Sequence, residues 1–203
     1  MKIEAILFDL GKVLVDFDMD TGIRAMLACS SMPKEKFEEI LWDKAWIRSY
    51  ERGEISTEEF HDYLCRSANL TMEFHQFRQT WSAVFAPGLI VSEQLLAALK
   101  RQYPLILVSN TNEAHAEYIR KNYSVFDYFD HHILSYEVGS LKPDAAIFRH
   151  AIAAAKLPPE ALFYTDDREE NIFAARALGI HAHRFVSEHE LILALRDAGI
   201  EIE

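Results

Sequence analysis

Five residues with charged or hydroxyl side chains lie where short apolar runs end or a helical run begins. They are Asp9 after residues 3–8, Ser109 after residues 105–108, Lys142 ahead of an Ala-rich helical run at 144–156, and Asp166 with Asp167 at the end of residues 161–165. A charged carboxylate cannot continue a buried strand without a partner, so it marks the strand's end. The carboxyl ends of parallel strands meet at one edge of a sheet, where ligands bind. The spacing therefore predicts that these side chains converge on one site.

Each residue type in this group suits a part of a reaction at phosphorus. Carboxylates at two strand ends suit a hard cation, and Mg²⁺ typically uses one or two carboxylates plus a substrate phosphate. Ser109 precedes a helix start, where backbone amides favour an oxyanion. Lys142 supplies a point charge for phosphate. Together with a carboxylate nucleophile, these groups indicate phosphoryl transfer through an aspartyl-phosphate.

The elements that must position these residues alternate between strand and helix. Strands are predicted at residues 3–8, 105–108, 132–134, 161–165 and 180–186, with helices at 89–102, 113–121 and 144–156, another ending at Gly179, and a last one capped by Ser187 and Glu190. Crossover connections through helices are right-handed and produce a mostly parallel sheet. The sequence therefore predicts an α/β fold, a Rossmann-like parallel sheet with helices on both faces.

Residues 17–86 interrupt this alternation with helical signals and most of the aromatic bulk. Aromatic side chains recur every three or four residues at Phe74, Phe77, Trp81 and Phe85. Such a stripe is typical of the core face of a helix. Ser56 and Glu59 have the spacing of a capping box at a helix start. We expect residues 17–86 to form an inserted α-helical cap domain, and residues 1–16 and 87–203 the α/β core with the catalytic groups.

The composition and net charge of the chain argue against nucleic acid and membranes as binding partners. The chain of 203 residues is half hydrophobic, and its net charge of −11 would repel the phosphates of nucleic acid. No apolar run is long enough to span a bilayer, and the first residues lead directly into a strand without a signal pattern. Cys29 and Cys65 are not paired by spacing and are expected to be reduced thiols. We therefore expect a cytoplasmic protein with no nucleic-acid or membrane partner, while its oligomeric state is left open.

As a set, the motifs resemble the haloacid dehalogenase superfamily, in the branch that carries a helical cap after the first strand. The motifs are Phe-Asp-Leu-Gly-Lys-Val-Leu at Asp9, Val-Ser-Asn-Thr at Ser109, Leu-Lys-Pro-Asp at Lys142, and Tyr-Thr-Asp-Asp-Arg-Glu-Glu-Asn at Asp166 and Asp167. The Asp-Leu-Gly motif and an Arg-Gly-Glu-Ile-Ser turn beginning at Arg52 are similar to those of bacterial sugar-phosphate phosphatases. The resemblance covers nearly the whole chain.

The resemblance implies a Mg²⁺-dependent hydrolase that acts on a small phosphorylated metabolite. It implies that Asp9 is the nucleophile, that Ser109 and the Asn110 amide hold the phosphoryl group, and that Lys142 bridges nucleophile and phosphate. It further implies that Asp9, Asp167 and the Gly11 carbonyl bind the metal. Asp166 would be a metal ligand or an outer partner, and Asn171 would support that loop. Cap side chains, Arg52 among them, are expected to contact the leaving group. Substrate identity does not follow from these residues.

One departure leaves the activity open. Most phosphatases of this superfamily have an acid two residues after the nucleophile, and here that position is Gly11. Loss of a positioned acid typically costs about 10²–10⁴-fold in rate. The departure predicts preference for good leaving groups, a stand-in acid at Asp16 or Asp18, or a non-catalytic metabolite-binding protein. Gly11 is also a candidate for a turn with positive φ.

Two further classes remain as alternatives. A metal-independent 2-haloacid dehalogenase would use Asp9 to attack carbon. The adjacent carboxylates Asp166 and Asp167 argue against this class, because such a pair is typical of a cation-binding site. A phosphomutase is disfavoured because it must move protons between two hydroxyls and needs the missing acid.

Overall fold

A five-stranded parallel sheet forms the centre of the protein, and the computed structural model describes residues 2–202. The strands are β1 (Ala5–Phe8), β2 (Leu105–Ser109), β3 (His131–Leu134), β4 (Leu162–Asp166) and β5 (His181–Arg184), in the spatial order β3-β2-β1-β4-β5. Every neighbouring pair is parallel, with Leu7 opposite Ile106 on one side and Tyr164 on the other. The predicted α/β fold with a parallel sheet is confirmed.

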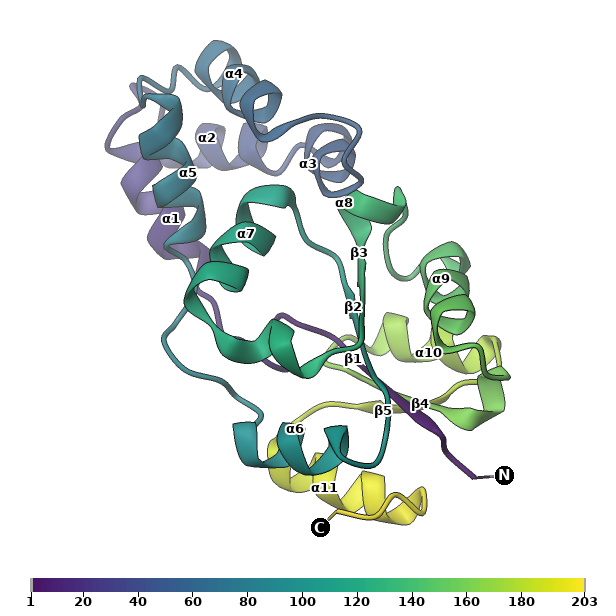
Figure 1. Ribbon diagram of the computed structural model, residues 1–203. Coiled ribbons are helices and arrows are strands. Elements are labelled where there is room, and N and C mark those ends of the chain that lie inside the picture. Colours follow the sequence, from purple (N-terminus) through teal and green to yellow (C-terminus); the bar gives the residue numbers. More distant parts are fainter. Residues whose placement is uncertain (1, 203) are drawn as a thin grey trace.

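Helices surround the sheet and extend beyond it. They are α1 (Met19–Leu27), α2 (Lys34–Leu41), α3 (Lys44–Glu51), α4 (Thr57–Ser67), α5 (Phe74–Ser82), α6 (Glu93–Lys100), α7 (Glu113–Asn122), α8 (Ser135–Val138), α9 (Ala145–Ala155), α10 (Glu169–Ala177) and α11 (Glu188–Asp197), with short 3-10 turns η1 (Ser124–Tyr128) and η2 (Pro159–Ala161). Helices α6, α7 and α11 lie on one face of the sheet, and α9 and α10 on the other (Figure 1).

Side chains alternate along β1 between two cores, one for each face. Ile6 and Phe8 pack with residues of α6, α7 and α11, whereas Ala5 and Leu7 pack with residues of α9 and α10. All four residues of β1 are fully buried, as expected of a central strand covered on both faces. The central strand that ends at Asp9 is therefore rigidly placed.

Several element ends differ from the predicted ones for local reasons. Helix α6 starts at Glu93 instead of residue 89, because the Ser92 hydroxyl accepts a hydrogen bond from the Leu95 amide and caps it there. Strand β5 covers only residues 181–184 of the predicted 180–186, and it pairs with β4 at the edge of the sheet. Strand β4 runs one residue further than predicted and includes Asp166.

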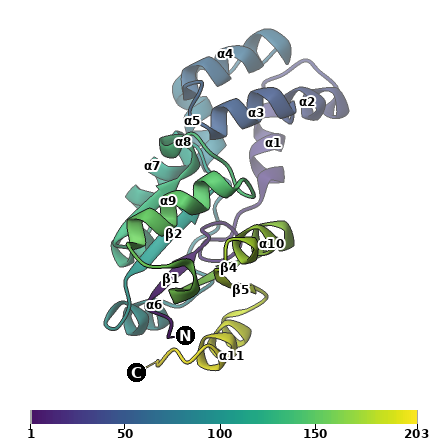
Figure 2. The same ribbon diagram turned by 90° about the vertical axis from the view of Figure 1, so that its right-hand side faces the viewer.

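Helices α1–α5 form a separate bundle beyond the carboxyl ends of the strands (Figures 1 and 2). The core of the bundle holds large buried aromatic side chains, among them Tyr50, Phe60, Phe77 and Trp81. Tyr50 and Phe60 stack with ring centroids 4.6 Å apart. The predicted capping box of Ser56 and Glu59 is present at the start of α4. Of the predicted stripe, Phe77 and Trp81 are buried inside the bundle and Phe74 is partly buried against it, whereas Phe85 lies beyond α5 and packs against the core of the sheet.

The chain enters and leaves this bundle at adjacent points. Phe17 and Phe85 form an antiparallel bridge, the Asp18 amide donates to the Val84 carbonyl at 2.8 Å, and the Ala86 amide donates to the Asp16 carbonyl at 2.9 Å. Whether residues 17–86 move as one domain stays a prediction. Within residues 2–202, no helix combines the length and apolar character that crossing a membrane would require.

Candidate active site

The order of the strands creates a crevice at the carboxyl ends of β1 and β4. From β1 the chain continues to β2 and β3 on one side, while β4 and β5 lie on the other side. Ligands bind in such a switch point of an open α/β sheet. Asp9 directly follows β1, and Asp166 is the last residue of β4. The fold therefore brings these two carboxylates together.

The Lys142 ammonium lies between these carboxylates. Its Nζ is 2.6 Å from Asp9 Oδ1 and 2.7 Å from Asp166 Oδ2, and all three side chains are buried. Burial alone would lower the pKa of Lys142, but the two carboxylates raise it above the ordinary value. Lys142 is therefore charged at neutral pH and fixes the position of the Asp9 side chain.

Both carboxylate oxygens of Asp166 accept hydrogen bonds from groups of the protein. Besides Lys142, it accepts hydrogen bonds from the Tyr164 hydroxyl, from Asn171 Nδ2 at 2.9 and 3.0 Å, and from the Arg168 amide at 2.8 Å. Burial would raise its pKa, but Lys142 and these hydrogen bonds lower it. Of the two expected functions of Asp166, this geometry favours the outer partner that orients the lysine.

Tyr164 was not identified from the sequence. It is fully buried, and burial together with the neighbouring carboxylates raises its pKa well above the usual range, so it stays a donor to Asp166. The sequence did contain a signal for this contact: residues two apart on a strand face the same side, and Tyr164 precedes Asp166 by two.

Asp167 completes a group of three carboxylates. One oxygen each of Asp9, Asp166 and Asp167 lie within 4.8 Å of one another. Burial raises the pKa of Asp9 to about 7, an effect that Lys142 opposes and Asp166 reinforces. Burial and Asp166 also raise the pKa of Asp167. When all three are ionised, three carboxylates against one ammonium leave about two negative charges, and oxygen donors with that excess fit a divalent hard cation.

The second strand end supplies Ser109 and Asn110. Ser109 is 2% exposed at the end of β2. The Asn110 side chain accepts from the Lys142 amide at 2.7 Å and donates to the Lys142 carbonyl at 2.9 Å. The Asn110 side chain therefore fixes the Lys142 backbone, which leaves its own backbone amide as the group expected to face an oxyanion.

A cavity of about 200 Å³ lies between this edge of the sheet and the helical bundle. Its polar side includes Gly11, Ser109, Asn110 and Glu51, and its apolar side includes residues of α1, α3 and α5 with Phe17 and Trp42. Arg52 is not among the lining residues; its guanidinium pairs with Asp144 at 3.4 Å across the junction of bundle and core. The expected contact of Arg52 with substrate stays a prediction.

Gly11 is needed because a side chain there would meet the Phe17 ring, and not because its backbone has a positive φ. It is absent from the glycines with positive φ, so that expectation was wrong. A Cβ added at Gly11 would lie 2.8 Å from Cε1 of Phe17. The Phe17 ring thus occupies the direction in which an acid side chain would start.

Neither expected stand-in acid is free. Asp16 pairs with Lys12 at 2.5 Å and accepts from the Phe17 amide at 2.8 Å, and these contacts lower its pKa. Asp18 caps α1 by accepting from the Asp20 amide at 3.0 Å. A carboxyl with a lowered pKa holds no proton to donate at neutral pH, so Asp16 is a poor general acid.

Comparison with known proteins agrees with this arrangement. The chain is 26% identical over 183 residues to a D-ribitol-5-phosphate phosphatase of Bacteroides thetaiotaomicron, covering 87% of this chain and 89% of that one. It is 25% identical over 182 residues to the sesquiterpene phosphatase astK of Aspergillus oryzae, covering 87% of each. The solved structure of the HAD family enzyme bt-2542 from Bacteroides thetaiotaomicron, in complex with magnesium and inorganic phosphate, matches with a TM-score of 0.83 at 28% identity, over 91% of this chain and 95% of that one.

The model of one protein family matches residues 3–179, which span strands β1–β4, the bundle and all the converging side chains. The chain belongs to the haloacid dehalogenase-like hydrolase family.

Proposed function

We propose that this hydrolase is a Mg²⁺-dependent phosphatase that releases phosphate from a small phosphorylated polyol or sugar. The observation that carries the proposal is the Lys142 ammonium, 2.6 Å from Asp9 and 2.7 Å from Asp166, beside a third carboxylate at Asp167. A lysine in this position neutralises phosphate oxygens next to a carboxylate nucleophile. The similarity to a D-ribitol-5-phosphate phosphatase supports the substrate class.

The residues take distinct parts in this proposal. The Asp9 carboxylate attacks phosphorus while the ester oxygen leaves, and water then cleaves the aspartyl-phosphate to return Asp9 and release inorganic phosphate. Ser109 and the Asn110 amide hold the phosphoryl oxygens, and Lys142 holds both nucleophile and phosphate. Asp9, Asp167 and the Gly11 carbonyl would hold Mg²⁺, which when bound supplies positive charge to the phosphoryl group. The bt-2542 structure with magnesium and phosphate supports the choice of ion.

A second substrate class is favoured by the apolar side of the cavity. Phe17, Trp42 and Val84 line it, and Trp42 is 40% exposed. A hydrocarbon leaving group such as that of a terpenoid phosphate would bury apolar area there. The similarity to a sesquiterpene phosphatase supports this alternative. The volume of about 200 Å³ favours the smaller polyol class, because pockets that bind drug-sized ligands have volumes of about 300–1,000 Å³.

A phosphate-release screen tests the proposal. Polyol phosphates, sugar phosphates, prenyl phosphates and an aryl phosphate are assayed with Mg²⁺ and with a chelator, and halide release from 2-haloacids is measured in parallel. We expect Mg²⁺-dependent phosphate release, highest with a polyol or sugar phosphate, and no halide release.

The Asp9→Asn variant is the matched control, since it keeps the size and removes the charge. Its turnover should fall to background while circular dichroism shows an intact fold. A variant that kept a tenth of the rate would exclude Asp9 as the nucleophile. Turnover that survives the chelator would exclude the metal, and halide release would favour the dehalogenase.

A further inference from the structure

The proposed phosphatase needs a proton donor that Gly11 cannot supply. An ester oxygen leaving as an alkoxide is a poor leaving group unless it is protonated, and the usual acid position is closed by the Phe17 ring. Asp16 and Asp18 are bound to other groups. This inference rests on the proposed function and asks which group moves the proton.

The residues that line the cavity restrict which side chain can move this proton. Two ionisable side chains line it, Glu51 from the bundle and His115 from α7. His115 Nε2 donates to the Trp81 carbonyl at 2.8 Å, and Nδ1 lies 3.2 Å from Asn112 Nδ2, which donates to it. Burial lowers the pKa of His115 to about 4, so the ring is neutral with both nitrogens used. Glu51 is the remaining candidate.

Glu51 is held at a fixed place by its backbone. It is the last residue of α3, and its carbonyl accepts a hydrogen bond from the buried Ser135 hydroxyl of the core at 2.6 Å. The next turn is equally close to the core, since a Cβ on Gly53 would lie 2.2 Å from the Tyr136 carbonyl oxygen. The end of α3 is thus docked on α8, and the Glu51 side chain is positioned at the cavity.

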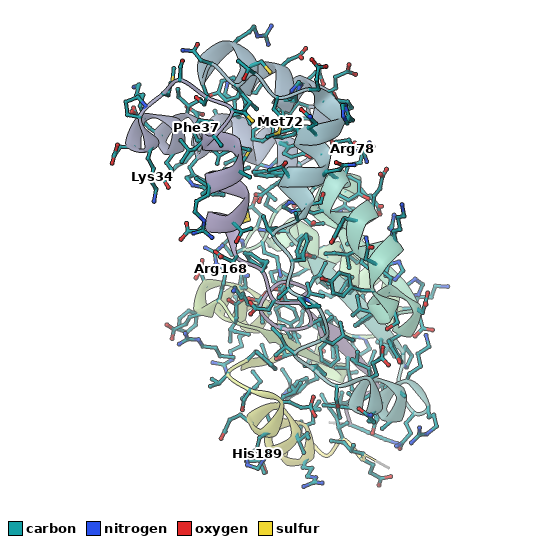
Figure 3. All side chains as sticks on the ribbon, turned by 90° about the vertical axis from the view of Figure 1, so that its left-hand side faces the viewer. Lys34, Phe37, Met72, Arg78, Arg168 and His189 are labelled. Atoms are coloured by element: carbon teal, nitrogen blue, oxygen red, sulfur yellow. The ribbon has the colours of Figure 1, made fainter. Side chains whose placement is uncertain are left out.

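Glu51 is partly buried, and none of the described residues forms a close ion pair with its carboxyl. Burial raises its pKa to about 7, while Arg168 of the core and Arg48 of its own helix act in the opposite direction. Figure 3 places Arg168 at the end of the core that faces the bundle. A carboxyl that is partly protonated at neutral pH has the property that a general acid and base needs.

The expected reaction geometry brings the leaving oxygen toward Glu51. In phosphoryl transfer the attacking and leaving oxygens lie roughly in line on opposite sides of phosphorus. Asp9 does not itself line the cavity, but Leu10 and Gly11, which follow it directly, do. We expect Asp9 to attack from the sheet, so that the leaving oxygen faces the bundle side of the cavity. The bundle side is lined by Trp42, Ile47, Glu51 and other residues, of which only Glu51 carries a transferable proton.

We propose that Glu51 is the general acid and base of this phosphatase, in place of an acid at position 11. As the Asp9 oxygen bonds to phosphorus and the ester P–O bond breaks, the Glu51 carboxyl gives its proton to the departing oxygen. The Glu51 carboxylate then takes a proton from water as that water bonds to phosphorus and the Asp9–phosphorus bond breaks. Each cycle consumes one ester and one water and returns both carboxyls to their starting forms.

The test compares the natural protein with Glu51→Gln on phosphate esters of graded leaving-group pKa. Glu58→Gln, an exposed change in the first turn of α4, is the matched control. With alkyl phosphates, Glu51→Gln should lose about 10²–10⁴-fold in kcat and little in KM. With an activated aryl phosphate it should give a rapid burst of phenolate followed by slow turnover, because the first step needs no acid while the second still needs the base.

Phosphoprotein should then accumulate on Asp9 in the Glu51→Gln variant and not in the control. The natural protein's kcat for alkyl esters should fall as the pH rises above about 7, and this limb should be absent from the variant. Full activity of Glu51→Gln on alkyl esters would overturn the inference. An equal loss on all esters, with neither burst nor phosphoprotein, would overturn it in favour of a structural role. Absence of turnover by the natural protein would overturn the proposed function itself.

Discussion

Asp9 and Glu51 are two carboxyls whose pKa burial raises, and their surroundings give them different properties. Asp9 contacts Lys142 at 2.6 Å and belongs to a group of three carboxylates. Glu51 faces Arg168 and Arg48 without such a contact. The pKa of each carboxyl is raised to about 7, so the difference between them is the positive charge beside them: the Lys142 ammonium contacts Asp9 directly, whereas the arginines act on Glu51 without such a contact.

The raised pKa of Glu51 predicts a pH dependence of stability. The folded protein binds this proton up to about pH 7, whereas the ordinary pKa is 4.5, so the folded state binds more protons and loses stability as the pH rises between these values. Glutamine cannot ionise. Glu51→Gln should therefore be more stable than the natural protein by about 1–3 kcal/mol at about pH 8, and equal to it near pH 4.

Urea unfolding of both proteins without metal, across that pH range, measures the difference. Glu58→Gln should show no such change. A Glu51→Gln variant that is less stable at about pH 8 would mean that the charged carboxylate is stabilised in the folded state.

Residues that follow strands were predictable from the sequence, and residues whose position depends on the bundle were not. Asp9, Ser109 and Asp166 converge because the carboxyl ends of parallel strands share one edge. Glu51 reaches the cavity only because the end of α3 docks on α8, and nothing in the spacing of residues 44–54 indicates that contact. The Phe17 contact with Gly11 was missed for the same reason, since it depends on how the chain enters the bundle.

The Phe17 contact predicts how an acid at position 11 would behave. Gly11→Asp placed in the Glu51→Gln protein should restore little activity, because its Cβ meets the ring at 2.8 Å. Adding Phe17→Ala should open that space and recover part of the roughly 10²–10⁴-fold loss on alkyl phosphates. Phe17→Ala alone in the Glu51→Gln protein is the control. If Gly11→Asp restored activity without the second change, the ring would not be the obstacle.

At the scale of elements, the end of α3 connects the bundle to the catalytic edge. The buried Ser135 hydroxyl contacts the carbonyls of both Glu51, at 2.6 Å, and Thr111, at 2.9 Å. Thr57 at the start of α4 donates to Glu113 of α7 at 2.9 Å. These contacts on both sides of the turn at Arg52 and Gly53 explain why the turn is tight against α8.

Gly53 is the residue on which this docking depends most. Its φ of +69° already favours glycine, and a Cβ would meet the Tyr136 carbonyl oxygen at 2.2 Å. Gly53→Ala should lower the free energy of unfolding by more than about 1 kcal/mol and should slow turnover of alkyl phosphates, because Glu51 moves away with the turn.

Gly199→Ala is the matched control for Gly53→Ala. Its φ is +76° and nothing lies within 4 Å of the added Cβ, so it has the backbone strain without the contact. Urea unfolding and alkyl phosphate assays of both variants separate the two effects. Equal losses of stability, with activity unchanged in both, would show that the contact with Tyr136 does not hold α3 on the core.

At the scale of the whole molecule, the sheet and the bundle are two packed bodies joined by a narrow connection. Each has its own apolar core, and the connection consists of Asp16–Asp18 paired with Val84–Ala86. The cavity between the bodies is small and is lined by both. We expect a substrate to enter before residues 17–86 close over the sheet edge, and this closure would exclude bulk water from the reaction.

This arrangement predicts a hinge at the paired segments. If residues 17–86 move as a unit, the amides of Asp18 and Ala86, which donate to Val84 and Asp16 at 2.8 and 2.9 Å, should exchange hydrogen more slowly once Mg²⁺ and inorganic phosphate are bound. Peptides from α11, whose Leu191 and Leu195 are buried in the core of the sheet, should show no change, since both cores stay packed. Hydrogen exchange measured by mass spectrometry, with Asp9→Asn as a variant whose metal and phosphate binding is impaired, tests this. Protection that spread evenly over α1–α5 and the sheet would indicate general stiffening, and a change confined to the sheet edge would indicate a bundle that does not move.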